Sequence, residues 1–492
     1  MADRAYSPCT LSRFTAGSEF PPEIANAARA RGCTSTMKYA LLAIGVAGIL
    51  PIALVLQSNI FVRKNFWIFF GLFPFLLPAL PQLDIEIISW DREWMTGHVR
   101  GLVVSAIDFI AVGAYIAIRH QKNSIRYHLP FILYACAIGL SVTQADVPST
   151  AALYLWQFIR IYFAAIVIAR ACVDEGVPEQ FMKGMAIGLG IQLVLVVYQK
   201  FVLGAVQPSG TFAHQNTLAL VIHMVVFPHL ALLLSGDRRL PNIAVPLAGF
   251  LVASLTASRA GIGFCVIGFV ACYLLSLTYK WTRWKAFMGV AGLATATALT
   301  PIAFSALENR FQISRLSEDA YNERAAFNRT AIVILGDHPL GVGANHYSYF
   351  GKNYGYSVRA GVIPFEGNLD NIVHNAYLLN AAESGYPGLI TFILLLFHPL
   401  WVAFRYSLKN VADHRSALLL GLGVSLMTVY AHSMFEYILV VQECQYAFAV
   451  IAGMTFGLAH QMRQAYPSGR GRNFRSSAHL QPGRASAGRL LR

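Results

Sequence analysis

The feature that most constrains this chain is a succession of apolar runs, each about 20 residues long, separated by short polar patches. A hydrocarbon core ~30 Å thick needs about 20 residues for each crossing helix. Because nothing in that core can hydrogen-bond a free backbone group, such runs must be helical. The sequence therefore predicts an all-α, polytopic transmembrane helix bundle. The candidate spans are 37–56, 64–81, 101–118, 128–142, 150–170, 182–204, 216–235, 242–257, 262–279, 286–305, 386–404, 416–436 and 443–460.

We expect about twelve of these candidates to cross the membrane, since Pro74 and Pro78 interrupt 64–81. Basic connections set the orientation, because Lys and Arg accumulate in cytoplasmic loops. The connections that this rule assigns to the cytoplasm are 119–127, 237–239, 280–285 and 405–415. Alternation then gives a cytoplasmic N-terminal segment (1–36), transmembrane helices over 37–305, a periplasmic loop (306–385), C-terminal spans over 386–460 and a basic disordered cytoplasmic tail (461–492).

Composition agrees with a membrane protein and argues against nucleic acid as a partner. Charged residues make up 13% of the chain, against about 25% in a soluble domain. The formal net charge is +14, but the Lys and Arg residues lie mainly at the ends of apolar runs. The arginine-rich tail is expected to lie near anionic lipid headgroups. The cysteines show no ligand spacing and are expected to be small core residues.

The long polar loop holds the strongest local pattern for chemistry. Helices are expected over 321–335 and 371–383. On the second helix His374, Tyr377 and Leu378 would share a face. A neutral histidine at the membrane surface can accept a proton from an attacking hydroxyl group. The alternative is that His374 caps or packs the loop.

Two arginines are candidates for binding an anion. Arg259 lies in a very short connection between apolar runs, and Arg324 lies in the first loop helix. The guanidinium group offers a fixed set of donors that matches phosphate oxygens. The alternatives are a helix-end charge for Arg259 and a solvated helix face for Arg324.

Each of the other candidate polar residues has two possible roles. Arg160 is mid-span, and a structural ion pair with Asp108 or Glu436 is expected first, with a role in the site second. Lys200 either extends to the interface or adds charge to an outer cavity. The stretch 209–216, which includes His214, either lines a sugar site or caps the next helix, where Asn216 suits an N-cap.

No metal and no cofactor is expected. His214, His346 and His374 fit no ligand motif, and the outer side has no paired acidic residues. A phosphate-binding loop for nucleotides is also missing from the sequence.

The chain resembles the O-antigen ligase and O-antigen polymerase superfamily of polyprenyl-diphosphate-dependent membrane glycosyltransferases. The resemblance lies in GTFAHQN (210–216), TASRAG (256–261), PLGVGANHY (339–347), and a His374-Asn375 pair followed after nine residues by Gly385-x-x-Gly388. It covers about residues 150–440, and the last spacing is typical of the ligases.

The resemblance implies a function and roles for particular residues. The donor would be an undecaprenyl-diphosphate-linked glycan, and the acceptor would be lipid A-core. The reaction would take place on the periplasmic side of the inner membrane. His374 would be the general base, while Arg259 and Arg324 would bind the diphosphate in place of a metal, and the reaction would invert the anomeric configuration. Arg160, Lys200, His214 and Tyr377 remain candidate lining residues. The alternatives are a repeat-unit polymerase, a protein O-oligosaccharyltransferase and, more remotely, a transporter.

Overall fold

The computed structural model describes residues 35–89, 95–118, 122–313, 317–365, 367–409, 411–437 and 439–466. The predicted N-terminal segment (1–36) and basic tail (461–492) lie largely outside these residues. Every segment predicted to span contains a helix. Those helices are α2 (Ser35–Ser58), α3 (Ile60–Leu76), α4 (Ala106–Ile118), α5 (His128–Val142), α6 (Pro148–Ala171), α7 (Val177–Phe201), α8 (Gln215–Ser235), α9 (Leu240–Leu255), α10 (Arg259–Leu277), α11 (Arg283–Ile313), α15 (Ala376–Ser407), α16 (His414–His432) and α17 (Gln442–Ala465).

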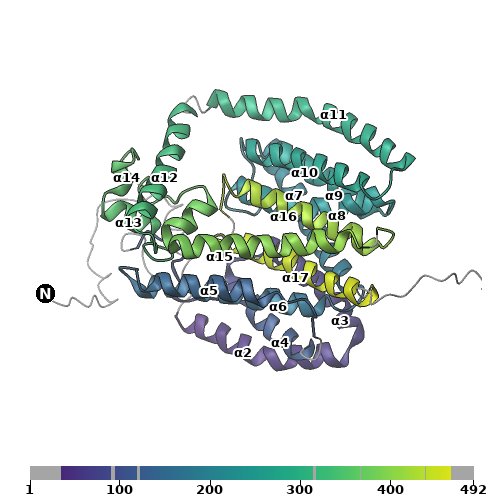
Figure 1. The fold of residues 1–492 in the computed structure, drawn as a ribbon, viewed down its shortest axis with the longest axis horizontal. Helices are drawn as coiled ribbons and strands as arrows, with labels where there is room; N and C mark the ends of the chain where they lie inside the picture. The colour runs from purple at the N-terminus through teal and green to yellow at the C-terminus, as the bar shows by residue number, and fades with distance from the viewer. Residues whose placement is uncertain are drawn as a thin grey trace, which may run out of the picture.

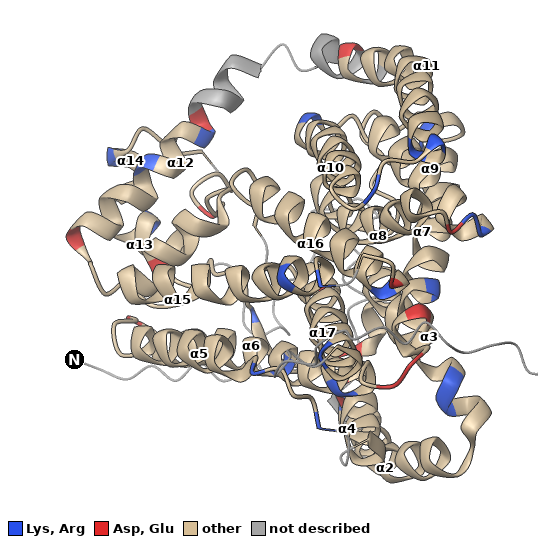
Figure 2. Cartoon of the chain, turned by 45° about the vertical axis from the view of Figure 1, so that its right-hand side comes forward, with Lys and Arg blue, Asp and Glu red and all other residues tan. Residues whose placement is uncertain are grey.

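The helices run side by side as one bundle (Figure 1). Among the described residues, seven helices are long and apolar enough to cross a membrane, and α4, α5 and α9 are shorter apolar helices. Charged side chains gather mainly at helix ends and connections (Figure 2). This architecture confirms a polytopic helical protein, while the number of about twelve spans stays a prediction.

The expected span at 101–118 is only partly a helix. Gly101–Ser105 forms strand β2, which pairs antiparallel with β1 (Asp84–Ser89), and α4 begins at Ala106. A Cβ atom at Gly101 would collide with the carbonyl oxygen of Ile88, so this close pairing requires glycine. The Ser105 backbone N–H donates to Asp108 Oδ2 at 2.8 Å, which starts the helix just after the strand. The prediction was wrong here because an apolar run does not distinguish a strand from a helix by itself.

The 306–385 segment carries structure of its own at one end of the bundle (Figure 1). Its helices are α12 (Ser317–Asp337), α13 (Tyr347–Asn353) and α14 (Tyr356–Arg359), and α12 confirms the helix expected over 321–335. A separate apolar core holds them together and is built around Phe327, Ile334, Val342, Tyr347, Phe350 and Val373. The segment is therefore a folded cap and not an open loop.

Helix α15 joins two helices that the sequence predicts as separate. Gly385 interrupts it with φ +65° and ψ −167°, a conformation suited to glycine. A Cβ atom here would collide with the carbonyl oxygen of Pro339. The first part of α15 packs in the cap, and the part after Gly385 continues as the predicted span.

Candidate functional site

The candidate site is centred on Glu436, in the connection between α16 and α17. Its side chain is 5% exposed. Glu436 Oε2 lies 3.4 Å from Nδ1 of His374, and Oε1 lies 3.7 Å from Nη2 of Arg324. One buried carboxylate therefore contacts both loop residues that the sequence singled out for chemistry.

Two further spans reach the same carboxylate through hydrogen bonds. The Asn216 side-chain amide donates to Glu436 Oε1. Ser258 Oγ donates to Asn216 Oδ1 at 2.7 Å and accepts from the Gly261 backbone N–H at 3.1 Å as the N-cap of α10. Glu436 thus links α8 and α10 to the cap. We name Arg324, His374, Glu436, Asn216 and Ser258 the Glu436 cluster.

Of the two roles open for the 209–216 stretch, capping of α8 is observed, but through His214 and not through Asn216. His214 occupies the N-cap position, and its Nδ1 accepts from the Asn216 backbone N–H at 3.3 Å. This frees the Asn216 side chain for Glu436 and Ser258. His214 is exposed and close enough to Glu436 to act on its charge.

The charges around Glu436 favour its ionised form. Burial alone would raise the pKa of Glu436, but the hydrogen bond and charge of His374, followed by Arg324 and His214, hold it below its usual value. The carboxylate is therefore ionised at neutral pH and can only accept hydrogen bonds. It follows that Nδ1 of His374 carries a proton, which in the neutral imidazole leaves Nε2 as the free base.

His374 lies just before α15 and not within it, so the expected helical face with Tyr377 and Leu378 does not form. Asn375 is the N-cap, and its Oδ1 accepts from the backbone N–H groups of Tyr377 and Leu378. The Ala376 N–H donates to the carbonyl oxygens of Ser433 at 2.9 Å and Glu436 at 3.1 Å. This docking fixes His374 beside Glu436, with 27% of its side chain exposed.

The two candidate arginines lie at the edges of the cluster. Arg324 is on α12, and 47% of its side chain is exposed, so it keeps donors for a ligand. Arg259 is the first residue of α10 and is exposed. Since it directly follows Ser258, the hydrogen bonds of Ser258 and Asn216 connect its backbone to Glu436.

The remaining candidate lining residues lie in other surroundings. Arg160 Nε donates to Asp108 Oδ2 at 2.6 Å and its Nη2 to the Tyr446 hydroxyl at 3.0 Å, so Asp108 is its ion-pair partner and Glu436 is not. Lys200 Nζ donates to the carbonyl oxygen of Val206 at 3.1 Å. The Tyr377 hydroxyl donates to the Tyr430 carbonyl oxygen at 2.9 Å, which joins α15 to α16.

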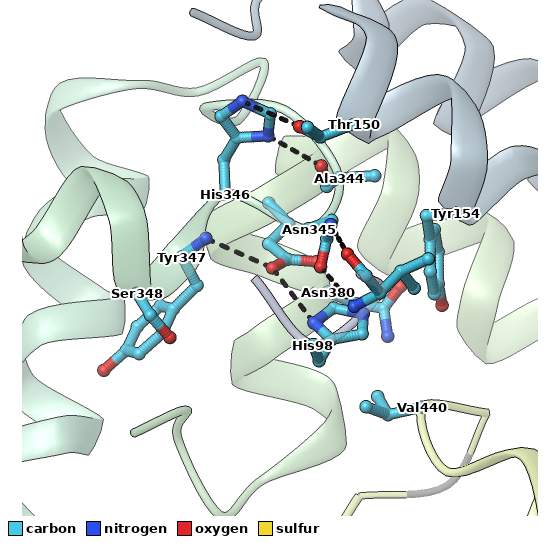
Figure 3. A network of polar contacts seen from close by, with 12 residues as sticks. His98, Thr150, Tyr154, Ala344, Asn345, His346, Tyr347, Ser348, Asn380 and Val440 are labelled. Carbon is cyan, nitrogen blue, oxygen red and sulfur yellow. Dashed lines mark hydrogen bonds and ion pairs between the residues drawn. The ribbon is translucent and has the colours of Figure 1, made fainter. Parts of the chain in front are cut away.

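A buried polar network anchors the 339–347 turn (Figure 3). Asn345, at φ +64°, exchanges two 2.8 Å hydrogen bonds with the backbone of Val99. The Tyr347 N–H donates to Glu383 Oε1 at 3.2 Å. His346 Nδ1 donates to the Ala344 carbonyl oxygen at 2.8 Å, since its Nε2 accepts from the Val147 N–H at 3.2 Å. The turn is thereby attached to α6, α15 and the segment before β2.

This network also positions the helix that carries Arg324. The Tyr347 hydroxyl donates to the carbonyl oxygen of Phe327 on α12 at 2.8 Å. His98 completes the network, with Nδ1 3.9 Å from Glu383 Oε1 and a side chain that is 8% exposed. Burial, helped by repulsion from His346, lowers the pKa of His98 to about 3. The ring is therefore neutral at neutral pH, and the contact with Glu383 is not an ion pair.

Sequence reasoning did not assign Glu436, Asn216 and Ser258 to one site. The available signal was positional: GTFAHQN and TASRAG were both singled out, and Glu436 lies near the outer end of a predicted span. Glu436 was considered only as a partner for Arg160. Among the residues that the structure describes, no three His, Cys, Asp or Glu side chains are grouped to hold a metal ion.

Comparison with known families adds one finding. Residues 244–393 match the family model described as O-antigen ligase. The matched span contains Arg259, Arg324 and His374, whereas Asn216 and Glu436 lie outside it. A search of curated proteins finds no match.

Proposed function

Since this chain is, by its 244–393 domain, a member of the O-antigen ligase superfamily, we propose that it transfers a glycan from undecaprenyl diphosphate to lipid A-core at the periplasmic face of the inner membrane. The observation that carries the proposal is the pairing of both His374 and Arg324 with one buried carboxylate, Glu436. A base and an anion-binding cation are thereby held within one cluster. The exposed parts of both side chains are available to substrates.

In the proposed reaction His374 is the general base. Glu436 holds Nδ1–H, so Nε2 takes the proton from an acceptor hydroxyl group while the hydroxyl oxygen attacks the anomeric carbon of the donor glycan. The carbon–oxygen bond to the diphosphate breaks, and attack from the opposite side inverts the configuration. A carboxylate behind the imidazole stabilises the imidazolium that forms, as in other base–carboxylate pairs. A positioned base of this kind contributes about 10²–10⁴-fold to the rate.

In this proposal Arg324 and Arg259 bind and stabilise the diphosphate leaving group. Breaking the glycosidic bond leaves undecaprenyl diphosphate with increased negative charge. Fixed guanidinium donors stabilise that charge more in the transition state than in the ground state. Arg259 also starts α10, and the amino-terminal end of a helix favours anions.

The test is His374→Ala in the native host, followed by analysis of the surface glycans. Loss of O-antigen from lipid A with accumulation of long lipid-linked chains supports the ligase. Lipopolysaccharide with a single repeat unit would instead indicate a polymerase, and loss of protein glycosylation alone would indicate a protein O-oligosaccharyltransferase. Unchanged glycans would refute His374 as the base.

A matched control separates chemistry from cap stability. His338→Ala removes an imidazole from the same 306–385 segment, where Nε2 lies 3.4 Å from the Tyr356 hydroxyl and not in the Glu436 cluster. This variant should keep the wild-type glycan pattern at equal protein level. An equal loss in both variants would indicate damage to the cap and contradict a specific role for His374.

A further inference from the structure

A large apolar cavity lies between α11 and the bundle, and no residue of the Glu436 cluster lines it. Its volume is about 570 Å³, within the ~300–1,000 Å³ range of small-molecule pockets. The lining reaches from Leu233 and Trp284, beside the basic connections, to about the middle of α10 and α11 at Val266 and Ala296. The cavity therefore occupies the half of the bundle that the positive-inside rule assigns to the cytoplasmic leaflet.

The polar groups that line the cavity are already satisfied within the protein. Trp284 Nε1 donates to the Leu233 carbonyl oxygen at 2.7 Å, the Tyr273 hydroxyl to Lys285 O at 3.2 Å, and Thr295 Oγ1 to Ala291 O at 2.8 Å. The interior thus offers hydrocarbon surface to an occupant. Such a cavity does not hold water well and suits an apolar chain.

The cavity opens sideways, toward the lipid. Phe287 and Leu293 line it, yet they are 60% and 71% exposed. Between Arg283 and Ser305, α11 buries Lys285 but no apolar side chain, and Figure 1 shows α11 at the outer edge of the bundle beyond α10. An acyl chain can therefore enter between the helices without unfolding either of them.

The rim is cationic. Arg238, Arg239, Lys280 and Arg283 are exposed, and the guanidinium carbon of Arg238 lies 3.9 Å from the centre of the Trp284 ring. Asp237 is the acidic residue of these connections, and it pairs with Arg239 at 3.4 Å. Basic pockets between helices on the cytoplasmic side are suited to anionic lipid headgroups.

We propose that this cavity binds an anionic phospholipid of the cytoplasmic leaflet, with an acyl chain between α11 and the bundle and its phosphate at Arg238 and Arg283. The bound lipid replaces the side-chain packing that α11 lacks. Because α11 precedes α12 in the chain, the lipid also supports the helix that carries Arg324. The inference is independent of the proposed glycosyl transfer.

The experiment uses the purified full chain in detergent and native mass spectrometry with phosphatidylglycerol and phosphatidylethanolamine. The wild-type protein should bind phosphatidylglycerol more tightly than phosphatidylethanolamine. Arg238→Gln with Arg283→Gln should weaken that binding about fivefold per arginine and leave phosphatidylethanolamine unchanged. Gly292→Leu, whose Cβ position lies 3.4 Å from Phe269, should fill the cavity and reduce binding of both lipids.

The matched control is Arg405→Gln. Arg405 is also exposed and lies over a tryptophan, 4.6 Å from the Trp401 ring centre at the end of α15, but neither residue lines the cavity. The proposal predicts wild-type binding for this variant. Equal weakening by Arg405→Gln, no preference for phosphatidylglycerol, or displacement of phosphatidylglycerol by undecaprenyl phosphate would each overturn it. If the double variant is unstable, phosphatidylglycerol binding is measured instead with Gly292→Leu and with the single variant Arg283→Gln. Both should bind it more weakly than wild type, and wild-type binding in both would overturn the proposal.

Discussion

Nδ1 of His374 lies 3.4 Å from Oε2 of Glu436, although the two residues belong to different segments of the chain. Because Glu436 is buried and ionised, it accepts a hydrogen bond from Nδ1–H of the imidazole and leaves Nε2 unprotonated in the neutral ring. The contact explains how a histidine outside any helix can be held in one orientation. In the proposed mechanism it makes Glu436 a positioning residue, distinct from the base His374.

Glu436→Gln should lower glycan transfer by about 10²–10⁴-fold, the range of a lost base contribution. The amide keeps the shape but cannot balance the charge of an imidazolium. The measurement is transfer rate in vesicles at saturating donor. Glu323→Gln is the control, because Glu323 precedes Arg324 on α12 but contacts Asn368 and not the cluster. Activity within twofold of wild type in Glu436→Gln would contradict the positioning role.

Arg324→Gln should reduce transfer by about 10²-fold, as expected for one lost donor to a developing oxyanion. Arg324→Lys should recover only part of this loss, since an ammonium group lacks the guanidinium fork. The control is Arg329→Gln on the same helix, because Arg329 donates to the carbonyl oxygen of Ala360. If Arg329→Gln were as inactive as Arg324→Gln, the loss would reflect α12 stability and not donor binding.

Asn216→Ala should destabilise the protein by about 1–3 kcal/mol, because it leaves a buried carboxylate oxygen and the Ser258 hydroxyl without their partner. Ser258→Ala removes the same hydrogen bond together with the cap of α10, which is worth about 0.5–2 kcal/mol. The double variant should lose less than the sum of the two, since both remove one shared contact. Thermal unfolding in detergent measures all three, and strict additivity would show that the two side chains do not interact.

The buried imidazole of His98 should make a contribution to stability that is lost as the pH falls below about 6.5. Unfolded chains protonate this histidine near pH 6.5, whereas in the folded protein its pKa is about 3. The unfolded state therefore binds more protons between these values, and stability falls by up to ~1.4 kcal/mol per pH unit on acidification. His98→Phe should flatten the slope of unfolding temperature between pH 6.5 and 5, where most carboxylates do not titrate. Above pH 7, where His98 is neutral in both the folded and the unfolded state, the variant and wild type should have the same slope, and an unchanged slope below pH 6.5 would contradict the prediction.

The helix bundle was predictable because an apolar run about 20 residues long can cross a bilayer as an α-helix, which satisfies all of its backbone hydrogen bonds internally. The helix around Arg324 was predictable from its apolar spacing. The strand at Gly101–Ser105 was not, because its pairing with β1 depends on a contact between backbones and not on local pattern. Glu436 was missed for a similar reason. Its partner Asn216 is 220 positions away in sequence, and a single sequence carries no signal for such a contact.

The position of Glu436 near the end of the chain has a consequence for biogenesis. Ribosomes deliver Asn216, Ser258, Arg324 and His374 to the membrane well before the connection between α16 and α17. Until that connection arrives, His374 has no carboxylate beside it, and α8 and α10 lack their shared acceptor. The last two helices therefore complete the Glu436 cluster as they insert, and the proposed mechanism predicts that a nascent chain lacking them cannot transfer a glycan.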